Sequence, residues 1–150
     1  MPIEIRVLRR GDEGVLARVA DDVFDDPVDA AAAAEFVADP RHHLAVAVED
    51  GVVVGFASGV HYVHPDKPRP EMWINEVGVS PRCQGRGVGK AVVDALLEAA
   101  RGLGCSVAWV LTERDNTAAM RLYASRGGVE AEAPAVMFEF PLDDPPPPRG

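Results

Sequence analysis

The sequence predicts an α+β domain, mixed in its order of helices and strands and built around one central sheet. The first observation is the order of the hydrophobic patterns: strand, two helices, three strands, helix, strand, helix, strand. The second is length, because a chain of 150 residues without an internal repeat is most simply one domain. The third is composition: 47% apolar and 26% charged residues are ordinary for a globular protein.

The N-terminal part of the chain predicts one strand and two helices. Ile3–Leu8 alternates apolar and charged residues, as an edge strand does. Residues 12–24 place their apolar side chains on one helical stripe. A second helix is expected over about residues 28–38, and Asp39-Pro40 ends it, because the residue before a proline is disfavoured in a helix.

The middle of the chain predicts three strands, over His43–Val48, Val52–Tyr62 and Glu71–Val79. Glu49-Asp50-Gly51 predicts a hairpin turn between the first two, because Asp-Gly tolerates the positive φ values that such turns need. Residues 64–70 (HPDKPRP) predict a proline-rich loop before the third.

The C-terminal half predicts two further helices, Arg86–Leu103 and Asn116–Ser125. A strand over Ser106–Thr112 lies between them, and a last strand is expected over Val136–Phe140. Residues 143–150 (DDPPPPRG) have no means of packing a core, so we expect a domain over residues 1–142 followed by a disordered tail.

Composition also limits the classes of partner. The formal net charge is −9, and residues 1–75 hold fourteen acidic residues against seven basic ones. An acidic chain is poorly suited to nucleic acid and better suited to a small cation, although excess acid can also serve solubility alone. Neither a membrane span nor a signal peptide is evident, and two cysteines make no disulfide framework, so we expect a cytoplasmic protein.

The stretch EVGVSPRCQGRGVGK, residues 76–90, predicts an anion site. Its glycines fit neither a dinucleotide fingerprint nor a P-loop. A glycine-rich loop between a strand and a helix nevertheless leaves free backbone N–H groups at the positive end of the helix dipole. Arg82, Arg86 and Lys90 add positive charge. The alternative is a plain flexible turn with basic residues in solvent.

The spacing Gln84-x-x-Gly87-x-Gly89 resembles the acetyl-CoA signature of the GNAT acetyltransferases. The segment Asn116–Tyr123, followed by Gly127, resembles the second motif of that family. The resemblance extends over nearly the whole chain. It implies a mixed, mostly antiparallel twisted sheet of about 6–7 strands, splayed at the fourth strand and flanked by about four helices. It also implies acetyl-CoA as cosubstrate and no metal.

The resemblance assigns the cofactor site residue by residue. The fourth strand would separate from its neighbour at a bulge, and its backbone at Val77, Gly78 and Val79 would bind the pantetheine arm. The second motif would contribute Asn116 and Ala119 to the same arm, and Tyr123 would protonate the departing thiolate unless it is only a packed helix residue. The pyrophosphate would be held by the backbone of Gln84, Gly85, Arg86, Gly87, Val88, Gly89 and Lys90.

One stretch departs from the family pattern. After the tyrosine segment the family usually continues Gly-Phe, whereas this chain has Gly127-Gly128-Val129. We therefore expect a local change in the loop after the last helix, with no effect on the cofactor site.

Glu76 is the expected general base, because an amine must lose a proton to become a nucleophile. Strict alternation would place Glu76 on one face with Met72, Ile74 and Gly78, among apolar neighbours that could raise its pKa. The alternative is a buried glutamate with a structural role. The stretch YVHPDKPRPEMWINEVGV resembles the aminoglycoside 3-N-acetyltransferases within GNAT, although that group prefers Asp where this chain has Glu76.

This resemblance implies a cationic small-molecule acceptor, an aminoglycoside acetylated at its 3-amino group, and a homodimer. Alternatives are a polyamine, another small amine, a protein amine, or a non-catalytic acyl-CoA sensor. The four histidines have no metal-ligand spacing. Any single carboxylate of the acceptor site listed next could instead be a solvated residue on a helix face or, at Asp115, a helix cap. The expected acceptor-site carboxylates are Asp21, Asp25, Asp26, Glu76, Glu113 and Asp115.

Overall fold

The computed structural model describes residues 2–143 and 149. A five-stranded sheet runs in the order β1-β2-β3-β4-β5. The first four strands form antiparallel pairs, and β5 lies parallel to β4. The expected mixed, mostly antiparallel sheet is thereby confirmed, with fewer strands than expected. The strands are β1 (Glu4–Val7), β2 (His42–Glu49), β3 (Val52–His64), β4 (Lys67–Val79) and β5 (Val107–Val110).

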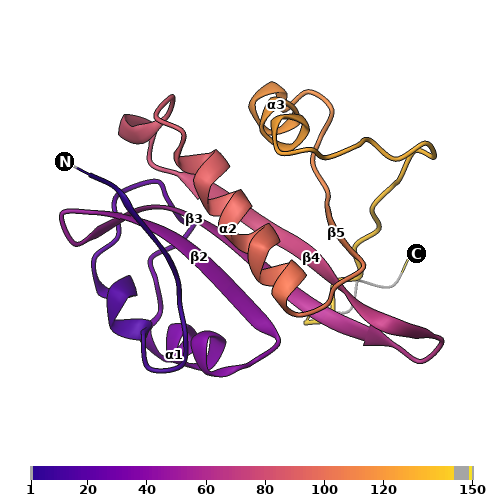
Figure 1. Ribbon diagram of the computed structural model, residues 1–150, viewed down its shortest axis with the longest axis horizontal. Helices are drawn as coiled ribbons and strands as arrows, with labels where there is room; N and C mark the ends of the chain where they lie inside the picture. The colour runs from indigo at the N-terminus through magenta and orange to yellow at the C-terminus, as the bar shows by residue number, and fades with distance from the viewer. Residues whose placement is uncertain (1, 144–148, 150) are drawn as a thin grey trace.

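Three α-helices and two 3-10 turns complete the described chain. Figure 1 shows α2 crossing one face of the sheet and α3 beyond the end of β5. The helices are α1 (Ala30–Ala38), α2 (Val88–Gly102) and α3 (Thr117–Ser125), and the 3-10 turns are η1 (Glu13–Ala17) and η2 (Pro81–Cys83). No helix among the described residues is long and apolar enough to cross a membrane.

The helix expected over residues 12–24 is wrong, because only η1 is helical there. The chain beyond it runs beside β3: the Ala20 N–H donates to the Val53 carbonyl, and the Val53 N–H donates to the Arg18 carbonyl, both at 2.9 Å. These bonds to a distant strand replace the local helical ones. Tertiary pairing therefore overrides the helical stripe of the sequence.

The loop expected over residues 64–70 is also wrong, because β3 and β4 form one long hairpin with Pro65 and Asp66 at its turn. Pro68 and Pro70 fit in β4 for a positional reason. The ladder with β3 includes Lys67 and Glu71 but none of residues 68–70, and pairing with β5 starts only at Glu71. A proline is tolerated where its missing N–H faces no ladder.

The last expected strand, Val136–Phe140, does not form. Its apolar side chains are 74–81% exposed, at Val136, Met137, Phe138 and Phe140. Alternation alone supplies no partner strand, and Pro134 and Pro141 flank the segment, so it has no ladder among the described residues. Of the expected disordered tail, residues 144–148 and 150 lie outside the described residues.

The sheet has an apolar core on each face. On one face α2 packs Val88, Val92 and Leu96 against Ala57 and Met72. On the other face η1, α1 and the segment between them cover β2 and β3, in a cluster that includes Leu16, Val37, Leu44, Val46 and Phe56. The second face is covered over β2 and β3, and its remaining part, over β4 and β5, carries the candidate site.

Candidate active site

A β-bulge in β4 decides which way Glu76 points. Ser58 of β3 pairs with Glu76, but the next residue, Gly59, pairs with Ile74, so Asn75 is an extra residue in β4. An extra residue turns the side chains beyond it to the opposite face of the strand. The expected alternation is therefore wrong: Ile74 packs in the core beneath α2, whereas Glu76 is exposed on the face covered by η1 and α1.

For the same reason, two of the apolar neighbours expected for Glu76, Met72 and Ile74, lie on the opposite face. The carboxylate lies on the open side of the sheet, opposite the apolar layer formed by Met72 and Ile74. Val77 and Val79, beyond the bulge, return to the α2 face and pack against the core. The bulge thus places the Glu76 carboxylate on one face of β4 and its apolar sequence neighbours Met72 and Ile74 on the other.

Strand β4 stops pairing with β5 two residues before Glu76. Pairing between β4 and β5 covers only Glu71–Ile74, opposite Val107–Val110. Figure 1 shows the two strands diverging toward α3. The splay expected at the fourth strand is therefore present, and on the β5 side the backbone of residues 77–79 pairs with no described strand. Such an open edge can bind an extended ligand arm as an added strand.

The glycine-rich loop continues from this edge. The Ser80 N–H donates to the Val54 carbonyl at 2.8 Å, and Cys83 is fully buried, so the start of the loop is fixed to the sheet. Gly85 and Gly87 have φ values of 81° and 80°, in the left-handed region that glycine adopts without strain. Among the described residues, no backbone acceptor takes the N–H groups of residues 85–90. These N–H groups lie just before α2 and in its first turn, and they can bind an anion there.

Arg86, one of the three basic residues of this loop, is paired with a carboxylate. Its Nη2 donates to Oε2 of Glu49 at 2.6 Å, and Arg82 lies 3.9 Å from the same carboxylate. The hydrogen bond from Arg86 is the largest cause that lowers the pKa of Glu49, and the charges of Arg86 and Arg82 act in the same direction. Sequence reasoning missed Glu49, because it took that residue as part of a hairpin turn.

The helix α3 lies against the start of α2. A Cβ on Gly89 would stand 3.4 Å from Leu122, so the missing side chain lets the two helices approach. Asn116 caps α3, because its side chain accepts a bond from the Ala119 N–H at 3.1 Å. Its amide N–H groups are donors that this cap does not use. Tyr123 is half-buried, and burial raises the pKa of its phenol, which keeps the phenol protonated.

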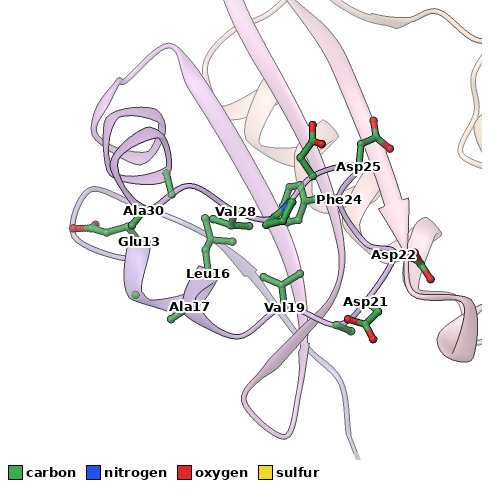
Figure 2. Close-up of a pocket in the computed structure, with 15 residues that line it drawn as sticks. Glu13, Leu16, Ala17, Val19, Asp21, Asp22, Phe24, Asp25, Val28 and Ala30 are labelled. Carbon is green, nitrogen blue, oxygen red and sulfur yellow. The ribbon is translucent and has the colours of Figure 1, made fainter.

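An acidic segment, residues 21–26, passes over the open face of β4. A Cβ on Gly78 would lie 2.3 Å from the Val23 carbonyl oxygen, so the glycine permits this close passage. The backbone at Asp22 is left-handed, with φ 61°, which turns the chain there. Figure 2 shows the carboxylates of Asp21, Asp22 and Asp25 along a cavity of about 820 Å³.

An adjoining cavity of about 350 Å³ brings Glu76 together with two of the expected carboxylates, Asp25 and Asp26. Asp29, Asn75 and Ser58 also line it, and its apolar wall includes Phe24. Asp21 lines only the larger cavity of the two. Glu113 and Asp115 are exposed and line neither, so the fold does not bring them to Glu76 in the way that it brings Asp25 and Asp26.

The comparisons with known proteins identify the family. Residues 14–128 match the model of the acetyltransferase (GNAT) family. This chain belongs to the GNAT acetyltransferase family. The N-alpha-acetyltransferase RimI of Mycobacterium tuberculosis is 35% identical over 128 residues, covering 84% of this chain and 78% of that protein.

Solved structures agree with this acetyltransferase fold. An aminoglycoside acetyltransferase from an uncultured soil metagenomic sample, in complex with sisomicin, aligns with a TM-score of 0.78 at 19% identity. That alignment covers 94% of this chain and 97% of that one. AAC(6')-Iy, in complex with the bisubstrate analogue CoA-S-monomethyl-acetylneamine, aligns with a TM-score of 0.74 at 20% identity, over 93% of this chain and 99% of that one. At these identities the likeness concerns the fold.

An aromatic patch of this acetyltransferase lies further along the open face. Trp73 and Trp109 stack with ring centroids 5.5 Å apart, and the Trp109 Nε1–H donates to the Tyr62 hydroxyl at 2.6 Å. Trp73 precedes Asn75 in β4, and its side chain lies on the face that carries Glu76. Sequence reasoning missed the patch. The alternation that places Trp73 on the face opposite Met72 is the signal for Trp73 in the sequence, whereas its contact with Trp109 depends on the register of β5.

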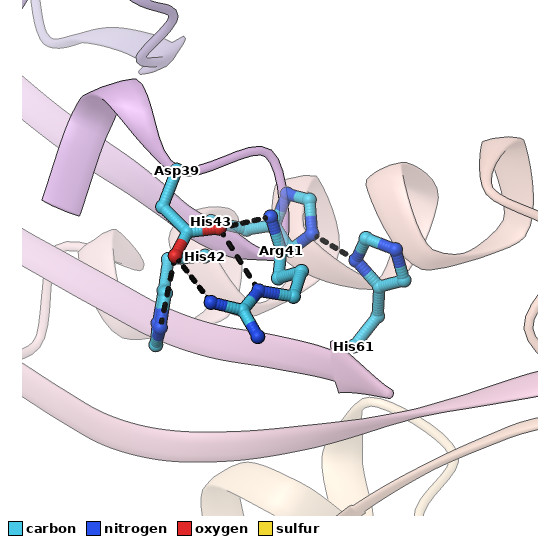
Figure 3. A network of polar contacts seen from close by, with 5 residues as sticks. All are labelled: Asp39, Arg41, His42, His43 and His61. Atoms are coloured by element: carbon cyan, nitrogen blue, oxygen red, sulfur yellow. Dashed lines mark hydrogen bonds and ion pairs between the residues drawn. The ribbon is translucent and has the colours of Figure 1, made fainter. Parts of the chain in front are cut away.

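Histidines gather at the start of β2, at the end opposite Glu49. Figure 3 shows His43 facing His61, with Nε2 and Nδ1 2.7 Å apart, and Asp39 binding Arg41 beside them. The pKa of His43 is lowered to about 4, chiefly by burial and in smaller part by the charges of His61 and His42. The described residues contain no group of three or more side chains that could hold a metal ion.

Proposed function

We propose that this acetyltransferase moves the acetyl group of acetyl-CoA to an amino group of a polycationic small molecule, an aminoglycoside, at its 3-amino group. The observation that carries the proposal is the 350 Å³ cavity, because its lining holds Asp25, Asp26, Asp29 and Glu76 and no lysine or arginine. A cavity lined by charge of one sign raises the local concentration of ligands of the opposite sign. Several ammonium groups on one ligand match several carboxylates.

The donor would bind along the splayed edge and the loop. The backbone of Val77, Gly78 and Val79 would bond the pantetheine arm, with Asn116 and Ala119 beside it. The free amides of residues 85–90 would bind the pyrophosphate, with Gln84 at the start of this grip. This arrangement directs the thioester toward the gap between β4 and β5. The gap opens beside Glu76, which lies one residue before the edge.

The reaction would proceed by direct transfer. The Glu76 carboxylate takes a proton from the substrate ammonium, directly or through water, and the freed nitrogen lone pair attacks the carbonyl carbon of the thioester. The new C–N bond forms as the C–S bond breaks, and the electron pair of that bond leaves with sulfur. Tyr123 donates its proton to the thiolate, and the nitrogen of the new amide gives up its second proton through water, which restores the phenol. Burial of the phenol supports this role, because the raised pKa of Tyr123 keeps the proton available at neutral pH.

The aromatic patch supports an acceptor that carries rings. Trp73 and Trp109 lie on the same face as Glu76, beyond Asn75, and the bond to Tyr62 holds the Trp109 ring in place. A stacked indole pair offers a flat face to sugar rings and to cations, and each cation over an indole contributes about 0.5–2 kcal/mol. A long acceptor could place one ammonium at Glu76 and a ring on this patch.

A second candidate keeps the chemistry and changes the acceptor to the N-terminal amine of a protein. The observation that favours it is the 35% identity to an N-alpha-acetyltransferase over most of both chains. Glu76 is exposed, so the N-terminal amine of a peptide could approach it. The two candidates differ in charge: an aminoglycoside needs the acidic segment, and an uncharged peptide does not.

An acceptor screen separates them. Purified protein is given acetyl-CoA with aminoglycosides of the gentamicin type, with spermidine, or with short peptides that carry a free N-terminus, and thiol release is measured. We expect turnover with aminoglycosides and a KM that rises with salt. Turnover confined to peptides supports the second candidate. Turnover with neither aminoglycosides nor peptides overturns both.

A further inference from the structure

Glu49, at the end of β2, carries a buried carboxylate. It is 8% exposed, whereas glutamate is rarely buried without a partner. Its two oxygens bond Arg86, at 2.6 Å to Nη2 and 3.4 Å to Nη1, and Arg82 approaches one of them to 3.9 Å. Both arginines belong to the loop before α2, 33 and 37 positions later in the chain. The carboxylate therefore joins the end of β2 to that loop.

The loop is fixed unevenly without this contact. Its start is held by the bond from Ser80 to Val54 and by buried Cys83. Its middle contains Gly85 and Gly87, and a Cβ at either position would meet nothing within 4 Å. Glycines in open space give the backbone many conformations, and holding one of them costs entropy. The bond between Arg86 and Glu49 lies between these two glycines, where the restraint has most effect.

We propose that Glu49 is a positioning residue for the acetyl donor: by holding Arg86 it fixes the loop amides in the arrangement that binds the pyrophosphate. The inference rests on the proposed function, in which this loop binds acetyl-CoA. Glu49 itself touches neither substrate. Its effect reaches the donor through Arg86 and the backbone, so it should change donor affinity and leave the acceptor site unchanged.

Electrostatics opposes this effect and must be separated from it. Removing the Glu49 charge frees two arginines, which would attract the phosphates of coenzyme A more strongly. The side chains of Arg82 and Arg86 are 60% and 43% exposed, so salt screens this attraction. The Debye length is about 10 Å at 0.1 M salt and about 3 Å at 1 M. The loss of the bond that holds the loop is not screened by salt in this way. Measurements at high salt therefore isolate the effect of that lost bond on donor binding.

The test compares Glu49→Gln, Glu49→Asp and the control Glu98→Gln. Glutamine keeps the size and removes the charge, and aspartate keeps the charge but is shorter by one methylene. Glu98 pairs with Arg101 on the surface of α2, with a side chain 79% exposed, and so offers a matched ion pair outside the loop. Each variant is assayed at 0.1 M and 0.5 M salt for Kd of coenzyme A, KM of acetyl-CoA, KM of the acceptor, kcat and Tm.

We expect Glu49→Gln to raise the Kd and the KM for the donor by about tenfold at 0.5 M salt, as for loss of one charge-assisted hydrogen bond. The increase should be smaller at 0.1 M salt. KM for the acceptor and kcat should stay within about twofold. Glu49→Asp should fall between wild type and Glu49→Gln, and Glu98→Gln should match wild type.

Two results would overturn the inference. One is an unchanged donor Kd in a folded Glu49→Gln protein. The other is an equal loss in the donor and acceptor constants, which marks a general structural defect. If Glu49→Gln does not fold, Glu49→Asp decides by the same criteria. A wild-type protein that does not bind coenzyme A at all refutes the proposed function instead, and that result is read before any variant.

Discussion

Replacing Gly78 with alanine tests whether the acidic segment is held over β4 as the site requires. The added Cβ would stand 2.3 Å from the Val23 carbonyl oxygen and 2.7 Å from the Phe56 ring. Ordinary contact begins at 3.4 Å, so the Val23 backbone must move by about 1 Å. Phe56 stacks on Phe24 at 4.0 Å between ring centroids, so the shift should carry the segment bearing Asp25 with it.

The size of the effect follows from overpacking. Forcing a methyl group into a filled site lowers the free energy of unfolding by about 1–3 kcal/mol, partly offset by the lower entropy of an unfolded chain with alanine. For a domain of this size, about 2–4 °C is lost for each kcal/mol, so Tm should fall by about 3–10 °C. A catalytic geometry displaced by about 1 Å can lose about 100-fold in rate, and we expect kcat/KM for the acceptor to fall by about 10–100-fold.

Thermal unfolding and acceptor saturation kinetics measure both effects. Gly102→Ala is the matched control, because a Cβ there meets nothing within 4 Å at the end of α2. It should leave Tm unchanged or slightly raised, since alanine favours the helix. A Gly78→Ala protein with the wild-type Tm and the wild-type acceptor KM would refute the close passage of the acidic segment and the acceptor site built on it.

Three further predictions concern other groups. Tyr123→Phe should lower kcat by about 10²–10⁴-fold with an unchanged donor Kd. The kcat of the wild type should persist above pH 10, because the pKa of Tyr123 is raised. An unaltered kcat in the variant excludes the acid role. Trp109→Leu should raise KM for an aminoglycoside about 2- to 30-fold and spare KM for acetyl-CoA, and equal changes in both would argue against the patch as an acceptor surface. The pKa of His43 falls from 6.5 to about 4 on folding, so the unfolded chain binds the extra proton and stability is lost as pH falls from 6.5 toward 4. Full linkage would give about 3 kcal/mol, which exposure of the half-buried ring reduces to about 1–2 kcal/mol, and His43→Gln should flatten the change in Tm between pH 7 and pH 4.5.

The sequence was a good guide where local pattern and structure share a cause. The glycine-rich loop before α2 follows from glycine spacing, and the helices α2 and α3 follow from periodic apolar residues. The family resemblance predicted the sheet type and the splay at the fourth strand. It also pointed to the acidic segment, of which Asp25 and Asp26 line the cavity with Glu76.

The sequence failed where distant segments decide. The bulge at Asn75 depends on the register with β3 and reverses the face of Glu76. The helix expected over residues 12–24 gives way to bonds with Val53, and the prolines before Glu71 fall where neither β3 nor β5 pairs with β4. Glu49 is paired with a loop residue 37 positions away, and nothing local to either residue indicates the contact.

The most direct test of the central claim is thiol release from acetyl-CoA at saturating aminoglycoside, measured side by side for wild type and Glu76→Gln. We expect release that depends on the aminoglycoside, with kcat about 10²–10⁴-fold lower in the variant and the Kd for coenzyme A unchanged. No release with any aminoglycoside, or a Glu76→Gln protein with the wild-type kcat, would contradict the claim that Glu76 accepts the proton of a polycationic amine.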